Sequence, residues 1–118
     1  MNNIQIAENF NLREFQCKGG TSEVVLHREL LERLQLLRTS LGLPVYINSG
    51  YRTVFHNARI GGRPNSYHLR GMAADIRVPG LTPGELATAA REAGFRGIGL
   101  YNTFVYVDIR ENRAEWRG

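Results

Sequence analysis

The chain has 118 residues, a length that fits one domain with a substantial core. With 42% hydrophobic and 22% charged residues, its composition is that of a folded protein and argues against intrinsic disorder. The net charge of +4 comes mainly from arginines spread along the chain, which argues against a nucleic-acid-binding tail and suits approach to an anionic polymer. The single cysteine, Cys17, excludes an internal disulfide and a multi-cysteine metal site.

The first ten residues lack the basic start and the long apolar run of a signal peptide, so we expect synthesis in the cytoplasm without an export signal. No segment approaches the roughly 18 apolar residues that a membrane helix needs. We therefore expect no membrane span.

The first half of the chain predicts two helices. Asn11 is a plausible N-cap for a short helix that includes Phe15. From Arg28 to Leu41, leucines recur at helical spacing and predict a helix with one face in the core. Gly42 ends that helix, and Pro44 prevents its continuation.

The middle of the chain predicts strands around a polar segment. Residues 45–48 are rich in β-forming side chains, and a helical turn is expected over residues 54–59. Residues 72–78 alternate as a short strand does, with Ala74 and Ile76 on one face and Ala73 and Asp75 on the other.

The last third predicts one helix and a strand pair. Thr82, Pro83 and Glu85 form a capping box at the start of a helix that runs to Gly94. Residues 97–101 and 104–110 are expected to pair as strands, and Trp116 to close a last short strand as a core or lid residue. The fold class predicted is α+β, a small antiparallel sheet with helices packed on one face, in a single domain over residues 1–118.

The most polar and glycine-punctuated part of the chain runs from Ser49 to Arg77. It contains His68 and, seven residues later, Asp75. Zinc readily takes imidazole nitrogen and carboxylate oxygen, and a catalytic zinc usually has three protein ligands and one open position. The spacing alone leaves two interpretations open: a metal site that uses both residues, or a structural role in which His68 caps a turn and Asp75 pairs with Arg70 or Arg77.

This stretch resembles the signature of the zinc D-Ala-D-Ala carboxypeptidases, a family related to phage L-alanoyl-D-glutamate endopeptidases and to the Hedgehog and lysostaphin-type folds. The matching residues are Ser49-Gly50-Tyr51-Arg52, His56-Asn57, Gly61-Gly62 and Ser66-x-His68-x-x-Gly71-x-Ala73-Ala74-Asp75. The resemblance extends from Asn9 to Trp116. It implies zinc as the cofactor, with His68 and Asp75 as ligands, and Arg52 and Ser66 as residues that meet the substrate.

The third ligand position departs from the family. The family has a histidine in a late strand, in a pattern like Phe-Val-His-Val-Asp-Val-Arg, and here the segment is Phe104-Val105-Tyr106-Val107-Asp108-Ile109-Arg110. Tyr106 stands in the ligand position, although a phenol with a pKa near ~10 is a poor zinc ligand unless the metal lowers that value. Alternation puts Asp108 on the same face, open to the cleft, as the candidate catalytic carboxylate that takes a proton from the attacking water.

The resemblance implies a zinc-dependent peptidase that cleaves peptide bonds in peptidoglycan stem peptides, with Arg52 binding a substrate carboxylate bidentately. Two alternatives remain open: a module on the same fold that binds cell-wall peptides through an impaired zinc site, and a phage structural component. Tyr106 favours the alternatives, and the joint presence of His68, Asp75 and Arg52 favours the enzyme. We expect a monomer with no nucleic-acid partner that reaches the cell wall only after release, as endolysins and tail-associated phage proteins do.

Overall fold

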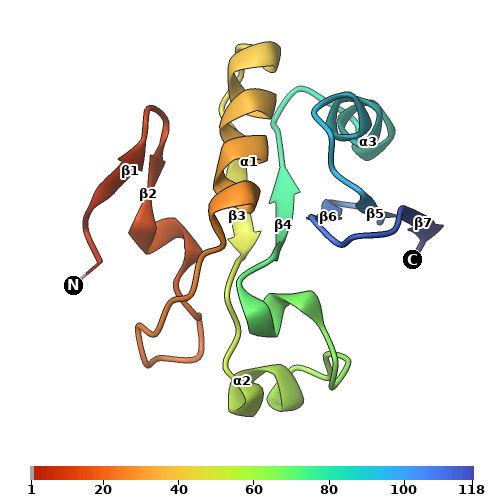
Figure 1. Ribbon diagram of the computed structural model, residues 1–118. Helices are drawn as coiled ribbons and strands as arrows, with labels where there is room; N and C mark the ends of the chain where they lie inside the picture. The colour runs from red at the N-terminus through yellow and green to blue at the C-terminus, as the bar shows by residue number, and fades with distance from the viewer. Residues whose placement is uncertain (1) are drawn as a thin grey trace.

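The elements of the fold succeed one another from a small N-terminal hairpin to a C-terminal edge strand. The computed structural model describes residues 2–118 (Figure 1). In chain order the elements are β1 (Gln5–Ala7), β2 (Phe10–Asn11), the 3-10 helix η1 (Leu12–Phe15), α1 (Arg28–Leu41), β3 (Tyr46–Ser49), α2 (Val54–Arg59), the 3-10 helix η2 (Tyr67–Arg70), β4 (Ala73–Arg77), α3 (Pro83–Glu92), β5 (Gly97–Leu100), β6 (Val105–Asp108) and β7 (Ala114–Arg117).

Local sequence signals set the helix ends. Asn11 caps η1 and Thr82 caps α3, each in a capping box with the glutamate three residues later. His27 caps α1 by accepting the backbone N–H of Glu29, and Gly42 ends the helix in the left-handed conformation at φ 65°. The predicted bounds of these helices are confirmed to within two residues.

The main sheet has five strands in the order β3-β4-β6-β5-β7. The first three pairs are antiparallel, as predicted, but β5 and β7 are parallel. The wholly antiparallel sheet expected from the sequence is therefore corrected to a mixed one. Because β6 already has β4 and β5 on its two edges, the chain that turns back after β6 pairs with the outer edge of β5, where it runs in the same direction as β5.

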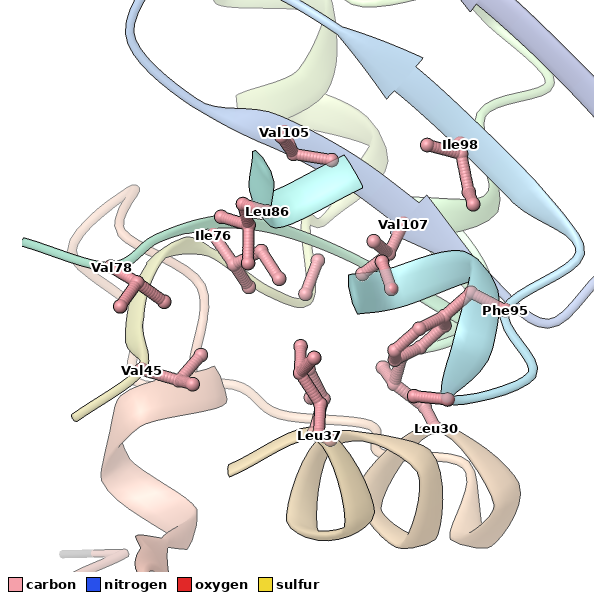
Figure 2. Packing of buried hydrophobic residues seen from close by; sticks show 14 of the residues in the cluster. Leu30, Leu37, Val45, Ile76, Val78, Leu86, Phe95, Ile98, Val105 and Val107 are labelled. Atoms are coloured by element: carbon pink, nitrogen blue, oxygen red, sulfur yellow. The ribbon is translucent and has the colours of Figure 1, made fainter. Parts of the chain in front are cut away.

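The helices α1 and α3 cover one face of this sheet. Leu30, Leu34 and Leu37 of α1 are at most 1% exposed and pack with side chains of α3 and the strands (Figure 2). Burying a leucine side chain contributes roughly 1.5–3 kcal/mol, so this helix face supplies a large part of the core. The core residues of the strands alternate with residues that point to the opposite face. That face carries the candidate site.

The N-terminal hairpin was not predicted from the sequence. The hairpin of β1 and β2 pairs Gln5 with Asn11 and Ala7 with Phe10, and its strands are too short to show a periodic pattern.

No helix in residues 2–118 has the length and apolar character required to cross a membrane.

Candidate active site

A cleft of about 660 Å³ lies on the face of the sheet opposite the two long helices. Strands β4 and β6 supply its floor with Asp75 and Tyr106, which are direct cross-strand partners. The segment from the end of α2 to η2 forms one wall, and the side chains around β5 and β7 form the other. The structure thus brings together Arg52, Ser66, His68, Asp75 and Tyr106, all of them named from the sequence.

His68 is held in one orientation and one tautomer. Ser66 caps η2 by accepting the backbone N–H of His68, and the ring is almost completely buried, at 2% exposure. Its Nδ1 lies 2.7 Å from the carbonyl oxygen of Gly50. Because a carbonyl can only accept, Nδ1 carries the proton and Nε2 presents its lone pair. This second contact fixes the ring as the outer partners of metal-binding histidines do.

Gly71 allows η2 to turn into β4. It has a φ of 68°, and a Cβ at this position would lie 2.3 Å from the carbonyl oxygen of Val25. Any other residue would therefore be strained and would push the turn between η2 and β4 away from the segment that precedes α1.

Asp75 receives one partner on each carboxylate oxygen. Oδ1 lies 3.3 Å from Nε2 of His68, and Oδ2 accepts a hydrogen bond from Nη2 of Arg52 at 3.1 Å. Arg52 is itself fixed, since its Nε donates to Oγ of Ser49 at 3.1 Å and its Nη1 donates to Oδ1 of Asn57 at 3.2 Å. The pairing of Asp75 with Arg70 or Arg77, one of the two interpretations left open by the sequence, is not what the structure shows.

The pair formed by His68 and Asp75 suits a cation. With the proton on Nδ1, two acceptor atoms, Nε2 of His68 and Oδ1 of Asp75, face each other across 3.3 Å. Two lone pairs at this distance repel each other unless a proton or a metal ion lies between them. An imidazole nitrogen beside a carboxylate oxygen is also a donor set that zinc accepts. Two ligand positions therefore fit zinc.

The third position holds a neutral phenol. Tyr106 lies edge-on to His68 with ring centroids 5.5 Å apart, and its hydroxyl donates to Oδ2 of Asp108 at 2.5 Å. Burial, followed by this hydrogen bond, raises the pKa of the Tyr106 hydroxyl far above its ordinary value. Within residues 2–118 no three histidine, cysteine or acidic side chains gather as a metal-binding group. The strong protein ligands at this site are thus His68 and Asp75, with Tyr106 beside them.

Asp108 lies beneath the cleft and not on its surface. Its side chain is 0% exposed, and its oxygens accept hydrogen bonds from Tyr106 at 2.5 Å and from Nε and Nη2 of Arg110 at 2.6–3.0 Å. A Cβ at Gly97 would lie 2.1 Å from Oδ1, so only glycine leaves room for the carboxylate. The expected position open to the cleft is therefore corrected: alternation gave the right face of the strand, but the side chains that cover Asp108 come from elsewhere. This geometry suits a residue that holds Tyr106 and Arg110 in place and does not support a general base.

An aromatic wall that sequence reasoning missed surrounds Arg110. Its guanidinium carbon lies 4.9 Å from the ring centre of Tyr67 and 5.1 Å from that of Trp116. The indole N–H of Trp116 donates to the hydroxyl of Tyr101 at 3.1 Å, and Tyr101 stacks on Phe104. Trp116 was expected as a core or lid residue, and it stands at the edge of the cleft. The signal was weak, because these side chains come from separate segments and meet only in the folded sheet.

The two residues of the pair His56-Asn57 have different surroundings. Asn57 is buried, accepts from Arg52 and donates to the carbonyl oxygen of Arg63 at 2.8 Å. His56 packs against Gly19 and does not line the cleft. Asn57 therefore links Arg52, which holds Asp75, to the wall of the cleft at Arg63.

Comparison with known proteins matches this arrangement to a family. A family model described as peptidase M15 covers residues 5–109, which includes every element from β1 to β6. The chain belongs to the peptidase M15 family. Its α+β fold, with the helices on one face of the sheet, was predicted from the sequence and is confirmed.

Individual relatives agree with the family assignment. The zinc D-Ala-D-Ala carboxypeptidase of Streptomyces albus G is 40% identical over 67 residues, which are 56% of this chain and 26% of that protein. The peptidoglycan L,D-endopeptidase MepK of Escherichia coli K12 is 32% identical over 88 residues, 67% of this chain and 48% of that protein. The crystal structure of the L-Ala D-Glu endopeptidase ChiX of Serratia marcescens aligns with 58% of this chain and 61% of its own, at 23% identity and a TM-score of 0.47. The chain spans about half or less of the length of these two curated relatives.

Proposed function

We propose that this protein is a zinc-dependent peptidase that cleaves peptide bonds in peptidoglycan stem peptides. The observation that carries the proposal is the pair of facing acceptors, Nε2 of His68 and Oδ1 of Asp75, at the floor of a cleft lined by arginines. The family assignment and the relatives named for zinc and for peptidoglycan support it. The cell wall, reached after release from the cytoplasm, is the proposed place of action.

His68 and Asp75 would hold the zinc ion, with Tyr106 beside the remaining position. When bound, zinc supplies Lewis-acid polarisation of the scissile carbonyl and lowers the pKa of water. Arg52 fixes Asp75 through Nη2, and the remaining N–H groups of its guanidinium would bind a carboxylate of the peptide. Ser66 orients His68 through the cap of η2 and lines the cleft where the peptide would lie.

A second candidate function rests on Tyr106. A phenol that donates to Asp108 offers no charge to a metal, so the same cleft suits a module that binds cell-wall peptides with weak or absent zinc. In that module Arg52 and the other cleft arginines would recognise the peptide, and no bond would be cut.

Zinc analysis followed by a hydrolysis assay separates the two candidates. The purified protein is loaded with zinc, dialysed and analysed for metal, and then incubated with muropeptides whose products are separated by chromatography. The peptidase predicts about one zinc per chain and products that disappear when a chelator is added. A protein that binds muropeptides, retains no zinc and forms no product would establish the binding module instead.

A further inference from the structure

The charge of the cleft exceeds what holding Asp75 requires. Four arginines line it, and among the side chains of its described lining residues the only carboxylate is that of Asp75; the arginines are Arg52, Arg63, Arg110 and Arg117. Arg52 is paired with Asp75, and in residues 2–118 neither Arg63 nor Arg117 has a carboxylate within 4.0 Å. A concave surface with this excess of positive charge attracts anionic ligands.

Arg110 is held in place by an ion pair and two aromatic rings. Two of its nitrogens, Nε and Nη2, bind the buried carboxylate of Asp108, with distances down to 2.6 Å. The guanidinium carbon also lies within 5.1 Å of the ring centres of both Tyr67 and Trp116. A side chain held by an ion pair and by two aromatic rings loses little conformational entropy when it binds a ligand.

One edge of the same guanidinium remains free. Nη1 of Arg110 makes no hydrogen bond to any of residues 2–118, although the side chain lines the cleft and is 22% exposed. Neutralising Asp108 uses Nε and Nη2 and leaves Nη1 without a task. A second role for Arg110 accounts for this edge.

We propose that Arg110 binds a second carboxylate of the substrate, so that the cleft selects peptides that carry two free carboxylates. The inference rests on the proposed function, in which Arg52 takes the first carboxylate. Arg110 lines the cleft and has Nη1 free of hydrogen bonds to residues 2–118, so this nitrogen is available to a ligand, and the neighbouring rings of Tyr67 and Trp116 would limit the access of water to the pair that forms. Hydrogen bonds between charged groups in such a setting change affinity by about tenfold or more.

The experiment varies the ligand and the protein together. Four peptides of one stem-peptide sequence, L-Ala-γ-D-Glu-L-Lys, are compared: with both carboxylates free, with the α-carboxylate of D-Glu amidated, with the C-terminus amidated, and with both amidated. Binding is followed by the fluorescence of Trp116, the single tryptophan of the chain, which lies against Arg110. The proteins are the wild type, Arg52→Lys, Arg110→Lys and the control Arg113→Lys. Arg113 is an exposed arginine outside the cleft that pairs with Glu115.

The expected result is a loss of preference that is specific to one carboxylate. In the wild type and in Arg113→Lys, amidating either carboxylate weakens binding by about tenfold. In Arg110→Lys one of the two amidations no longer matters, and in Arg52→Lys the other does not. A purely structural role for Arg110 would weaken all four peptides alike, and this pattern would overturn the proposal.

A variant with a milder effect on the fold guards against failure of Arg110→Lys to fold. Tyr67→Leu removes one face of the stack and leaves the ion pair of Arg110 with Asp108 intact, so it should reduce the same carboxylate preference at least threefold. An unchanged preference in a folded Tyr67→Leu protein, or a wild type indifferent to one of the amidations, also overturns the proposal. Peptides that bind with the expected preference but are never hydrolysed leave it standing and defeat the catalytic proposal. Hydrolysis without any carboxylate preference overturns the proposal for Arg110 and supports the catalytic proposal.

Discussion

Nε2 of His68 lies 3.3 Å from Oδ1 of Asp75, and Nδ1 of the same ring donates to the carbonyl of Gly50. The backbone of one segment thus determines which nitrogen of His68 is available to a metal. We expect His68→Ala to abolish zinc retention, because one of two strong ligands disappears. The variant and the wild type are dialysed against the same zinc buffer and analysed by atomic absorption. An unchanged zinc content in the variant would contradict the assignment.

Arg52→Lys tests the arginine that holds Asp75. Lysine keeps the charge but cannot make the separate hydrogen bonds to Ser49, Asn57 and Asp75 that the guanidinium makes. We expect binding of the free-acid stem peptide to weaken by about tenfold or more, measured by calorimetry. Arg113→Lys, an exposed arginine outside the cleft, serves as the matched control. Equal affinities in Arg52→Lys and the wild type would remove Arg52 from substrate binding.

Tyr106→His restores the side chain that the family resemblance places at this position. Histidine offers zinc a neutral nitrogen in place of a phenol that burial keeps protonated. Zinc should bind more tightly and muropeptide hydrolysis should rise, as measured by competition with a fluorescent chelator and by product analysis. Tyr106→Phe is the control, since it also loses the hydrogen bond to Asp108 but gains no ligand. If the histidine variant gains no more than the phenylalanine variant, the binding module becomes the better assignment.

Gly97→Ala tests the buried carboxylate beneath the cleft. The added methyl group would lie 2.1 Å from Oδ1 of Asp108, so the carboxylate or the strand must move. Overpacking of this kind costs roughly 1–3 kcal/mol of the free energy of unfolding, which urea denaturation measures. Gly84→Ala is the matched control: the nearest atom would be 3.9 Å away, and alanine in a helix is favoured by up to about 1 kcal/mol. Equal stability of the two variants would show that the packing around Asp108 is loose.

The ion pair of Glu29 with Arg96 predicts a dependence of stability on acid. The hydrogen bond from Arg96 lowers the pKa of Glu29 below its ordinary value, as does the positive charge of Arg96. The pair therefore stabilises the fold above the pKa that Glu29 has in the unfolded chain, and this contribution is lost as the pH falls through the lowered pKa. Urea denaturation at several pH values should show the wild type and Glu29→Gln converging in acid. Curves that stay parallel down to acidic pH would contradict the pairing.

Patterns within single elements explain what could be predicted from the sequence. The leucines of α1, the capping box at Thr82 and the alternation in β4 each depend on neighbours within one or two turns, so their predictions are confirmed. The seven-residue spacing of His68 and Asp75 left two interpretations open, and the family resemblance implied that both are metal ligands; the structure places the two side chains 3.3 Å apart.

The depth of a side chain and the partners across the sheet could not be predicted in this way. Alternation placed Asp108 on the correct face, but its cover includes Arg110, whose guanidinium is held between Tyr67 and Trp116. Tyr67 belongs to η2 and Trp116 to β7, so their meeting depends on the order of the strands. The parallel pairing of β7 with β5 could not be predicted for the same reason, because it also depends on the order of the strands in the sheet.

The strand order also has a consequence for the newly made chain. Strand β6, near the end of the sequence, lies between β4 and β5 in the sheet, so a chain that stops before residue 105 leaves both of these strands with an unpaired edge. Exposed edges of this kind pair readily with other chains, and contacts that close late in synthesis slow folding. Premature termination or slow release from the ribosome would therefore favour aggregation of the chain before the sheet is complete.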